Sequence, residues 1–181
     1  MIFRCAAAGA LLAVMLTGCA TRPAAVDPLM SGDRFSGRMS VQIDALDAEP
    51  ARSTSGAFEL MGNAQRGRLD LTTPIGSTVA RARWEPAGVF LETPQGNSQH
   101  PSLMDMTRTM LGEELPVPAM FDWLRGRPWS GADSVAASSN EPAGFHQLGW
   151  AVDLSKFDQA RIVARRSTPP VVIVQVRLDR P

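Results

Sequence analysis

Cysteine, histidine, lysine and tyrosine are scarce in this chain. Its 181 residues include two cysteines, two histidines and no tyrosine, and Lys156 is the only lysine. Both cysteines, Cys5 and Cys19, lie near the N-terminus, so the chain beyond residue 19 cannot form an internal disulfide bond. The lack of free thiols there suits an oxidising compartment such as the periplasm.

An excess of charge of one sign is also missing, because 18 basic and 18 acidic residues balance to a net charge of zero. No basic stripe or block of like charge is visible, so we expect no nucleic-acid partner. Beyond the first 18 residues, no apolar run approaches the length of a membrane-spanning helix. The sequence therefore predicts a domain that does not cross a membrane as a helix.

Residues suited to catalysis are few and scattered. The sequence contains no H-E-x-x-H, no G-x-S-x-G and no glycine-rich phosphate loop. His100 follows Gly-Asn-Ser-Gln and is interpreted as a solvated loop residue, while Glu113 and Glu114 are interpreted as a solvated pair at the end of a helix. We therefore expect no enzyme activity, no metal and no cofactor.

The N-terminus has the pattern of a bacterial lipoprotein signal. Arg4 precedes an apolar stretch of signal-peptide length, which is too short to span a bilayer. Leu16-Thr-Gly-Cys19 resembles the bacterial lipobox, in which small residues admit the peptidase and the cysteine sulfur carries diacylglycerol. We expect cleavage after Gly18 and lipidation of Cys19. The alternative is an ordinary cleaved signal that happens to contain cysteine.

Composition also sets the expected domain boundaries. Residues 1–18 are predicted to be the signal peptide. Residues 19–34 are predicted to be the lipidated N-terminus and a flexible tether, because proline and glycine interrupt any periodicity there. Residues 35–181 are long enough for one ordinary domain with its own core.

Most of this domain has the alternating pattern of β-strands. In the first segment Phe35, Val41 and Ile43 fall on one face. The last segment is the richest in β-branched residues, which predicts a central strand buried on both faces. Strands are predicted at residues 35–46, 55–61, 67–72, 77–84, 88–93, 145–152, 160–165 and 171–178.

Two short helices are predicted between the two groups of strands. Ser102 and Asp105 have the spacing of a capping box, and Gly112 suits the residue after a helix. Pro118 can open a second helix that ends at Gly126. Residues 130–144 are predicted to be loop. The expected fold class is mainly β with a helical insert, a single curved antiparallel sheet covered by short lid helices.

Methionine is concentrated in the predicted insert. Met104, Met106, Met110 and Met120 lie within or beside the two helices. Methionine is flexible and polarizable, so it suits a surface that accepts apolar groups of variable shape. The alternative is that these side chains only pack the helices on the sheet, and a lid can do both.

Short motifs also occur in a characteristic order. They are Phe35-Ser-Gly-Arg38, Leu69-Asp-Leu-Thr-Thr-Pro-Ile-Gly-Ser77, Leu115-Pro-Val-Pro118 and Trp123-Leu-Arg-Gly-Arg-Pro128. In this order, behind a lipobox, they resemble the LolB family, outer-membrane lipoproteins that receive other lipoproteins from the periplasmic carrier LolA. The resemblance covers nearly all of residues 35–178.

This resemblance implies an open, incomplete β-barrel with a helical lid over an apolar cavity. It also implies a loop with an exposed apolar residue that is needed to pass cargo to the membrane. Ile75 occupies that position between Pro74 and Gly76, which favour a tight tip. The alternative places Ile75 in the core. The expected cavity and lid residues are Phe58, Leu69, Leu71, Val79, Met106, Met110, Met120, Trp123 and Leu124.

The function implied by the resemblance is to accept lipoproteins from a LolA-type carrier and insert them into the outer membrane without energy input. The expected partners are this carrier, the acyl chains of the cargo and outer-membrane lipids, with the protein acting as a monomer that faces the periplasm. Ala20, in place of the aspartate that retains lipoproteins at the inner membrane, favours the outer membrane. The alternatives are an assembly lipoprotein that binds a protein partner and a lipocalin-like binder of small amphiphiles.

The sequence departs from the family pattern in three ways. It has no tyrosine, it ends without a terminal tryptophan, and the segment before the first strand is short and lacks aromatic residues. These departures concern the lip and the lining of the expected cavity.

Overall fold

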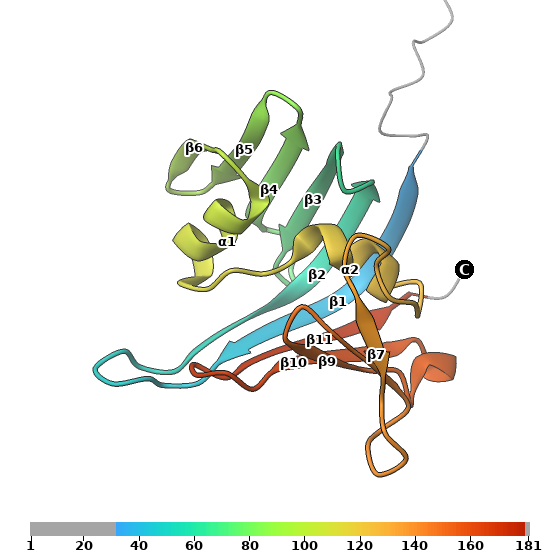
Figure 1. Ribbon diagram of the computed structural model, residues 1–181. Helices are drawn as coiled ribbons and strands as arrows, with labels where there is room; N and C mark the ends of the chain where they lie inside the picture. The colour runs from blue at the N-terminus through green and yellow to red at the C-terminus, as the bar shows by residue number, and fades with distance from the viewer. Residues whose placement is uncertain (1–31, 180–181) are drawn as a thin grey trace, which may run out of the picture.

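The computed structural model describes residues 32–179. These residues form one antiparallel sheet of eleven strands in the order β6-β5-β4-β3-β2-β1-β11-β10-β9-β8-β7 (Figure 1). The sheet is open, because its edge strands β6 and β7 do not pair with each other. Its strands are β1 (Asp33–Ile43), β2 (Arg52–Gly62), β3 (Gly67–Thr72), β4 (Thr78–Glu85), β5 (Gly88–Thr93), β6 (Gly96–His100), β7 (Ser134–Ala136), β8 (Gly144–Gln147), β9 (Trp150–Asp153), β10 (Arg161–Arg166) and β11 (Val172–Leu178).

Strands β1 and β2 form the long centre of the sheet and pair from Asp33 opposite Gly62 to Ile43 opposite Arg52. Along both strands buried and exposed residues alternate, because successive side chains point to opposite faces. One face of the sheet therefore holds the core, and the other carries polar and charged side chains.

Helix α1 (Leu103–Leu111) begins and ends where its sequence predicts. The Ser102 hydroxyl accepts a hydrogen bond from the Asp105 N–H at 3.1 Å and donates to the Asp105 carboxylate at 2.5 Å. Gly112 adopts the left-handed conformation, with φ of 79°, and donates its N–H to the Arg108 carbonyl. Both expected caps are thus confirmed.

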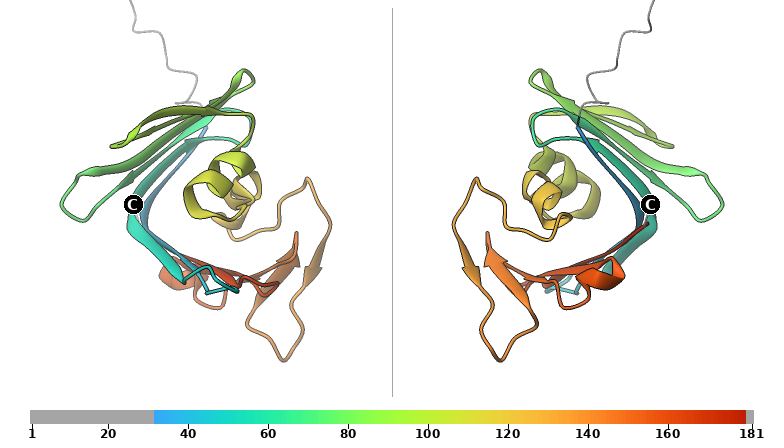
Figure 2. Two further views of the ribbon diagram at one scale, coloured as in Figure 1. Left: turned by 90° about the vertical axis from the view of Figure 1, so that its left-hand side faces the viewer. Right: turned by 90° about the vertical axis from the view of Figure 1, so that its right-hand side faces the viewer.

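Helix α2 (Val117–Trp123) follows after a short linker and includes Pro118 in its first turn. Figure 2 shows that the sheet is strongly curved and that both helices lie within its concave side. The apolar side of the sheet and the inner faces of the helices form one core, which includes Phe121, Trp123, Val172 and Val174. The expected fold class, an incomplete barrel with a helical insert, is confirmed.

Several predicted boundaries were wrong. The segment 145–152 is two strands rather than one, because Leu148 and Gly149 form a tight turn, both with positive φ, between β8 and β9. The predicted loop 130–144 contains β7, and a 3₁₀ helix, η2 (Phe157–Gln159), precedes β10. The first two strands cover residues 33–43 and 52–62, so their predicted ends shift by one to three positions.

Two predicted environments also need correction. His100 is buried at the end of β6 and its ring forms a 2.9 Å hydrogen bond with Ser98, so it is not a solvated loop residue. Strand β11 is central in the sheet, but it is not buried on both faces, because Gln175 and Arg177 are exposed on the outer side. The helices cover only the concave side and leave this outer face in solvent.

Candidate functional site

The described residues enclose an apolar cavity between the concave side of the sheet and the two helices. Its volume is about 410 Å³, within the usual range of small-molecule pockets, about 300–1,000 Å³. Side chains from β1 to β5, α1, α2, β10 and β11 line it, so strands far apart in the sequence contribute. All nine cavity and lid residues expected from the sequence lie on its wall, namely Phe58, Leu69, Leu71, Val79, Met106, Met110, Met120, Trp123 and Leu124.

The wall of this cavity contains no charged side chain. Its polar members are Thr54, Ser55, Thr93, Gln95 and Thr107, and all other lining residues are apolar. The Thr107 hydroxyl is already used, since it accepts a hydrogen bond from the Leu115 N–H at 3.0 Å. Such a surface can stabilise an uncharged, apolar ligand, but it offers no ionised group for catalysis.

The methionines divide between the wall and the surface. Met106, Met110 and Met120 line the cavity from the helices, and Met39 joins them from β1. Met104, by contrast, is half exposed on α1 and lies outside the cavity. Flexible side chains therefore form much of the wall on the side of the helices, whereas branched aliphatic residues and alanines form most of the sheet side.

A buried glutamine fixes α2 against β8. The Gln147 side-chain oxygen accepts hydrogen bonds from Trp123 Nε1 at 2.8 Å and from the Trp129 N–H at 2.9 Å. Its amide nitrogen donates to the carbonyls of Trp129 at 2.7 Å and Ala132 at 2.8 Å. All of these groups are thereby paired, and Trp123 is held in the wall of the cavity.

The linker between α1 and α2 is held from the other half of the sheet. Arg166 on β10 donates to the Glu113 carboxylate at 2.5 Å and lies 5.8 Å from the centre of the Trp150 ring. Arg108 on α1 also pairs with Glu114. The two glutamates predicted to be a solvated pair are therefore both engaged in ion pairs, and Glu113 is largely buried.

Ile75 lies at the tip of the loop between β3 and β4 and is 89% exposed. The loop is ordered by hydrogen bonds from the Thr73 N–H to the Ser77 carbonyl at 2.8 Å and from the Gly76 N–H to the Thr73 carbonyl at 2.9 Å. Gly76 has a φ of 87°, which few other residues adopt easily. The alternative position for Ile75 in the core is excluded.

Sequence reasoning missed Gln147 and the ion pair of Glu113 with Arg166. Gln147 alternates with the inward-facing Phe145, so its inward position could have been found from the strand pattern. The partners of Glu113 could not, because Arg166 is distant in the sequence. Within residues 32–179 no cluster of three metal-ligating side chains occurs, and neither helix of this region has both the length and the apolar character needed to cross a bilayer.

Comparison with known proteins identifies the family to which this chain belongs. A family model described as "Outer membrane lipoprotein LolB" matches residues 34–178, which is nearly the whole of the sheet and both helices. The chain belongs to the LolB family. The family resemblance predicted from the sequence motifs is therefore confirmed, and so is the outer-membrane location that it implies.

Individual relatives give the same result. The chain is 31% identical over 180 residues to the outer-membrane lipoprotein LolB of Bordetella petrii, covering 94% of this chain and 89% of the relative. It is 30% identical to that of Bordetella pertussis, covering 94% and 90%, and 33% identical to that of Thiobacillus denitrificans, covering 82% and 81%. The LolB family is the outer-membrane receptor for lipoproteins carried by LolA. The signal peptide, Cys19 and most of the expected tether lie outside the described residues.

Proposed function

We propose that this protein accepts the acyl chains of lipoproteins from a LolA-type carrier into the cavity beneath α1 and α2. It then releases them into the outer membrane, working as a monomer anchored through Cys19. Its action is transfer rather than catalysis. The observation that carries this proposal is a cavity of about 410 Å³ whose wall has no charged residue, in a chain of the LolB family.

The chemistry of the cargo explains why such a cavity is needed. Three C16 acyl chains expose on the order of 45 methylene groups, which at ~0.8 kcal/mol each oppose passage through water by roughly 35 kcal/mol. A carrier must cover these chains, and a receptor must bind them through apolar contact without holding them permanently. An uncharged wall that includes flexible methionines satisfies both requirements.

Transfer of this kind needs no nucleotide if affinity for the acyl chains rises from carrier to receptor to bilayer. The last step moves the acyl chains into the bilayer, which has the largest apolar volume of the three, so the free energy falls. The exposed Ile75 supports a role for the β3–β4 loop in that step, because moving an isoleucine side chain from water into the acyl region of a membrane lowers the free energy. We propose that Pro74, Ile75 and Gly76 together form the contact that starts release.

The experiment that tests this proposal uses a variant in which larger side chains fill the cavity. The variant Ala80→Phe/Ala164→Phe places two rings into it from opposite walls, since both alanines are buried and line it. Purified protein is mixed with a carrier loaded with radiolabelled lipoprotein, and the cargo on each protein is measured after separation. We expect the variant to accept several-fold less cargo than wild type.

The matched control is Ala57→Phe, which adds one ring to the outer side of β2, away from the cavity. It should accept cargo normally. Normal acceptance by a folded Ala80→Phe/Ala164→Phe protein would contradict the proposal. Competition by a small soluble amphiphile, with no transfer from the carrier, would instead favour a lipocalin-like binder.

A further inference from the structure

Three arginines lie side by side on the outer face of the sheet, opposite the helices. Arg38 on β1 is directly opposite Arg177 on β11, and Arg177 is directly opposite Arg161 on β10. Because residues opposite each other in an antiparallel pair point to the same face, the three side chains form one row across three strands. All three are exposed. We call this set the arginine row.

No ion pair neutralises the arginine row within the described residues. This differs from the neighbouring sector of the same face, where Arg68 and Arg81 both pair with Asp70 and Arg83 lies 4.0 Å from Glu92. Like charges directly opposite each other on neighbouring strands are destabilising. The chain therefore compensates arginines in one sector of the face and leaves them uncompensated in the other.

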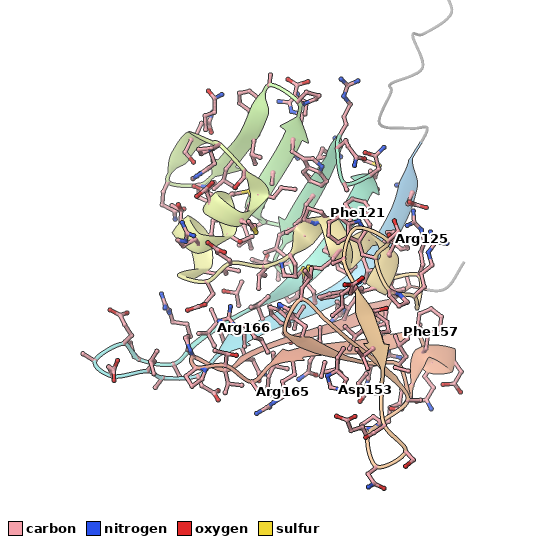
Figure 3. The ribbon with its side chains drawn as sticks, in the orientation of Figure 1. Phe121, Arg125, Asp153, Phe157, Arg165 and Arg166 are labelled. Carbon is pink, nitrogen blue, oxygen red and sulfur yellow. The ribbon has the colours of Figure 1, made fainter. Side chains whose placement is uncertain are left out.

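Around the row lie one further arginine and two carboxylates, so the four arginines still outnumber the acidic groups. Arg165, on the same side of β10, also has no ion-pair partner among residues 32–179, and Figure 3 shows it extending away from the helices. Between the row and the Arg165 end of the three strands, no outward-facing residue is a carboxylate. These outward-facing residues are Ser40, Gln42, Gln175, Ile173 and Val163. Of the carboxylates nearby, Asp179 accepts from the Ser36 hydroxyl at 3.0 Å and Asp153 accepts from the Ser155 N–H at 2.8 Å.

A shallow hollow adjoins the row. Its volume is about 560 Å³, and Arg38, Arg177, Gln159, Ala160, Leu178 and Asp179 line it. Guanidinium groups bind phosphate oxygens through paired N–H donors, so two arginines beside a hollow can hold a phosphate-bearing group. The Asp179 carboxylate in the same hollow is turned toward Ser36 by its hydrogen bond.

We propose that the arginine row binds the anionic phospholipid headgroups of the membrane in which the protein is anchored. The positive charge of the row is complementary to the negative charge of these headgroups, and the row lies on the outer face of the sheet rather than at the cavity. Gly32 leads into β1, the strand that carries Arg38, and it lies only thirteen positions after Cys19 in the chain. That length spans at most about 45 Å, so an anchored domain stays close to the membrane surface.

The position of the β3–β4 loop agrees with this orientation. Figure 2 shows that the loop extends away from the helices, on the outer side of the curved sheet. A membrane that contacts the arginine row therefore lies on the side to which the tip with Ile75 extends. The row holds the domain at the surface whether or not the cavity is occupied, so this inference does not depend on the proposed function of the cavity.

The experiment uses full-length lipidated protein reconstituted in vesicles of phosphatidylcholine, with or without phosphatidylglycerol. The variant Gln175→Cys places one thiol beside the row for a fluorescent label, because residues 32–179 contain no cysteine. Lipids with a nitroxide on the headgroup quench the label when this face touches the membrane. Wild-type protein without the added thiol serves as the labelling blank.

We expect quenching that requires phosphatidylglycerol and falls at high salt, since screening shortens the Debye length from about 10 Å at 0.1 M to about 3 Å at 1 M. Arg161→Gln/Arg177→Gln in the labelled protein should lower the docking equilibrium constant roughly 25-fold, about fivefold for each charge. The matched control Arg52→Gln/Arg66→Gln removes the same charge elsewhere and should change it little.

Quenching that is the same with and without phosphatidylglycerol, or unchanged in Arg161→Gln/Arg177→Gln, would overturn the proposal. If the same variant instead lost binding to the carrier in solution, the row would be a docking face for an acidic protein. A thermal melt of each variant confirms folding, and removing two like charges from the row should not lower the melting temperature.

Discussion

At the scale of single residues, the exposure of Ile75 is set by its neighbours. Pro74 restricts φ, Gly76 takes a φ of 87°, and hydrogen bonds between Thr73 and residues 76–77 close the loop. The isoleucine therefore cannot be buried against the sheet unless the backbone of the loop changes. Its exposure is a property of the loop rather than of one side-chain rotamer.

The variant Ile75→Glu tests the role of this residue in release. Because the side chain is 89% exposed, we expect a change in the free energy of unfolding within about 0.5 kcal/mol. Cargo acceptance should be normal, whereas insertion should fail because a carboxylate resists entry into the acyl region of a bilayer. The measurement is the cargo in carrier-bound, receptor-bound and membrane fractions, and we expect it to accumulate on the receptor.

The matched control is Ile75→Leu, which keeps an apolar tip and should insert cargo at the wild-type rate. Normal insertion by Ile75→Glu would show that the loop does not act in release.

The exposed position of Ile75 was predictable from Pro74 and Gly76, whereas the burial of His100 was not. Its surroundings in the sequence are polar, and only the pairing of β5 with β6 brings it against the core.

Glu141 is the carboxyl group with the clearest response to pH. The N–H and hydroxyl of Ser138 donate to it at 2.8 Å and the His146 ring lies at 3.0 Å, which lowers the pKa of Glu141 from 4.5 to about 2. Since the folded state favours the ionised form, the stabilisation is complete above pH 4.5 and is lost as the pH falls toward 2.

Carboxyl-detected NMR should therefore show Glu141 titrating at about pH 2. In Ser138→Ala one of the two donors from residue 138 is lost, so the midpoint should move up toward 4.5. A wild-type midpoint near 4.5 would show that these hydrogen bonds do not persist in solution.

At the scale of elements, the helices were more predictable than the edge strands. Ser102 and Gly112 act through local hydrogen bonds, so the limits of α1 could be predicted from neighbouring residues alone. Strands β6 and β7 form the two edges of the sheet, and their residues are mostly polar and exposed. They are strands because their backbones pair with β5 and β8, which no hydrophobic pattern records.

The attachment of α2 to β8 depends on Gln147, which yields a prediction at this scale. Gln147→Leu removes four hydrogen bonds and leaves Trp123 Nε1, the Trp129 N–H and two carbonyls without their partner. We expect a loss of about 3 kcal/mol or more in the free energy of unfolding, measured by urea titration, because each group left buried and unpaired costs about 1–3 kcal/mol.

Gln175→Leu is the control, because Gln175 is exposed on the outer face of β11 and makes no side-chain hydrogen bond among residues 32–179. It should change stability by less than about 0.5 kcal/mol. Equal stabilities for the two variants would mean that α2 is held by its apolar packing alone. The strand pattern indicates that Gln147 points inward, but its partners could not be predicted, because they lie on Trp123 and on residues 129–132, which are 15 to 24 positions away in the chain.

At the scale of the whole molecule, the residues of the cavity wall were predictable but the hollow itself was not. Alternation along the strands indicates which side chains face inward, and the helical pattern places Met106 and Met110 opposite them. Whether such side chains meet or leave space depends on sheet curvature and on the distance of the helices from the sheet. These arise from the pairing of all eleven strands together.

Ligand binding should consequently appear as a change in global stability. A ligand that binds only the folded state at one hundred times its dissociation constant stabilises it by about 2.7 kcal/mol. For a domain of this size, each kcal/mol raises the melting temperature by about 2–4 °C, so a soluble lipopeptide should raise it by roughly 5–10 °C. The gain arises because burial in an uncharged wall removes methylene groups from water.

The cavity-filling variant separates this effect from binding at the surface. Ala80→Phe/Ala164→Phe removes the space that the acyl chain requires, so its melting temperature should not respond to the lipopeptide, whereas Ala57→Phe should respond as wild type does. Without ligand, the melting temperature of this variant relative to wild type shows whether the two rings fit the cavity. Rings that fill empty space add contacts and raise it, whereas rings that crowd the wall add strain and lower it. An equal rise in all three proteins would place the lipopeptide outside the cavity. Stabilisation confined to wild type and Ala57→Phe would place it inside, where the acyl chains and the two helices contact each other directly.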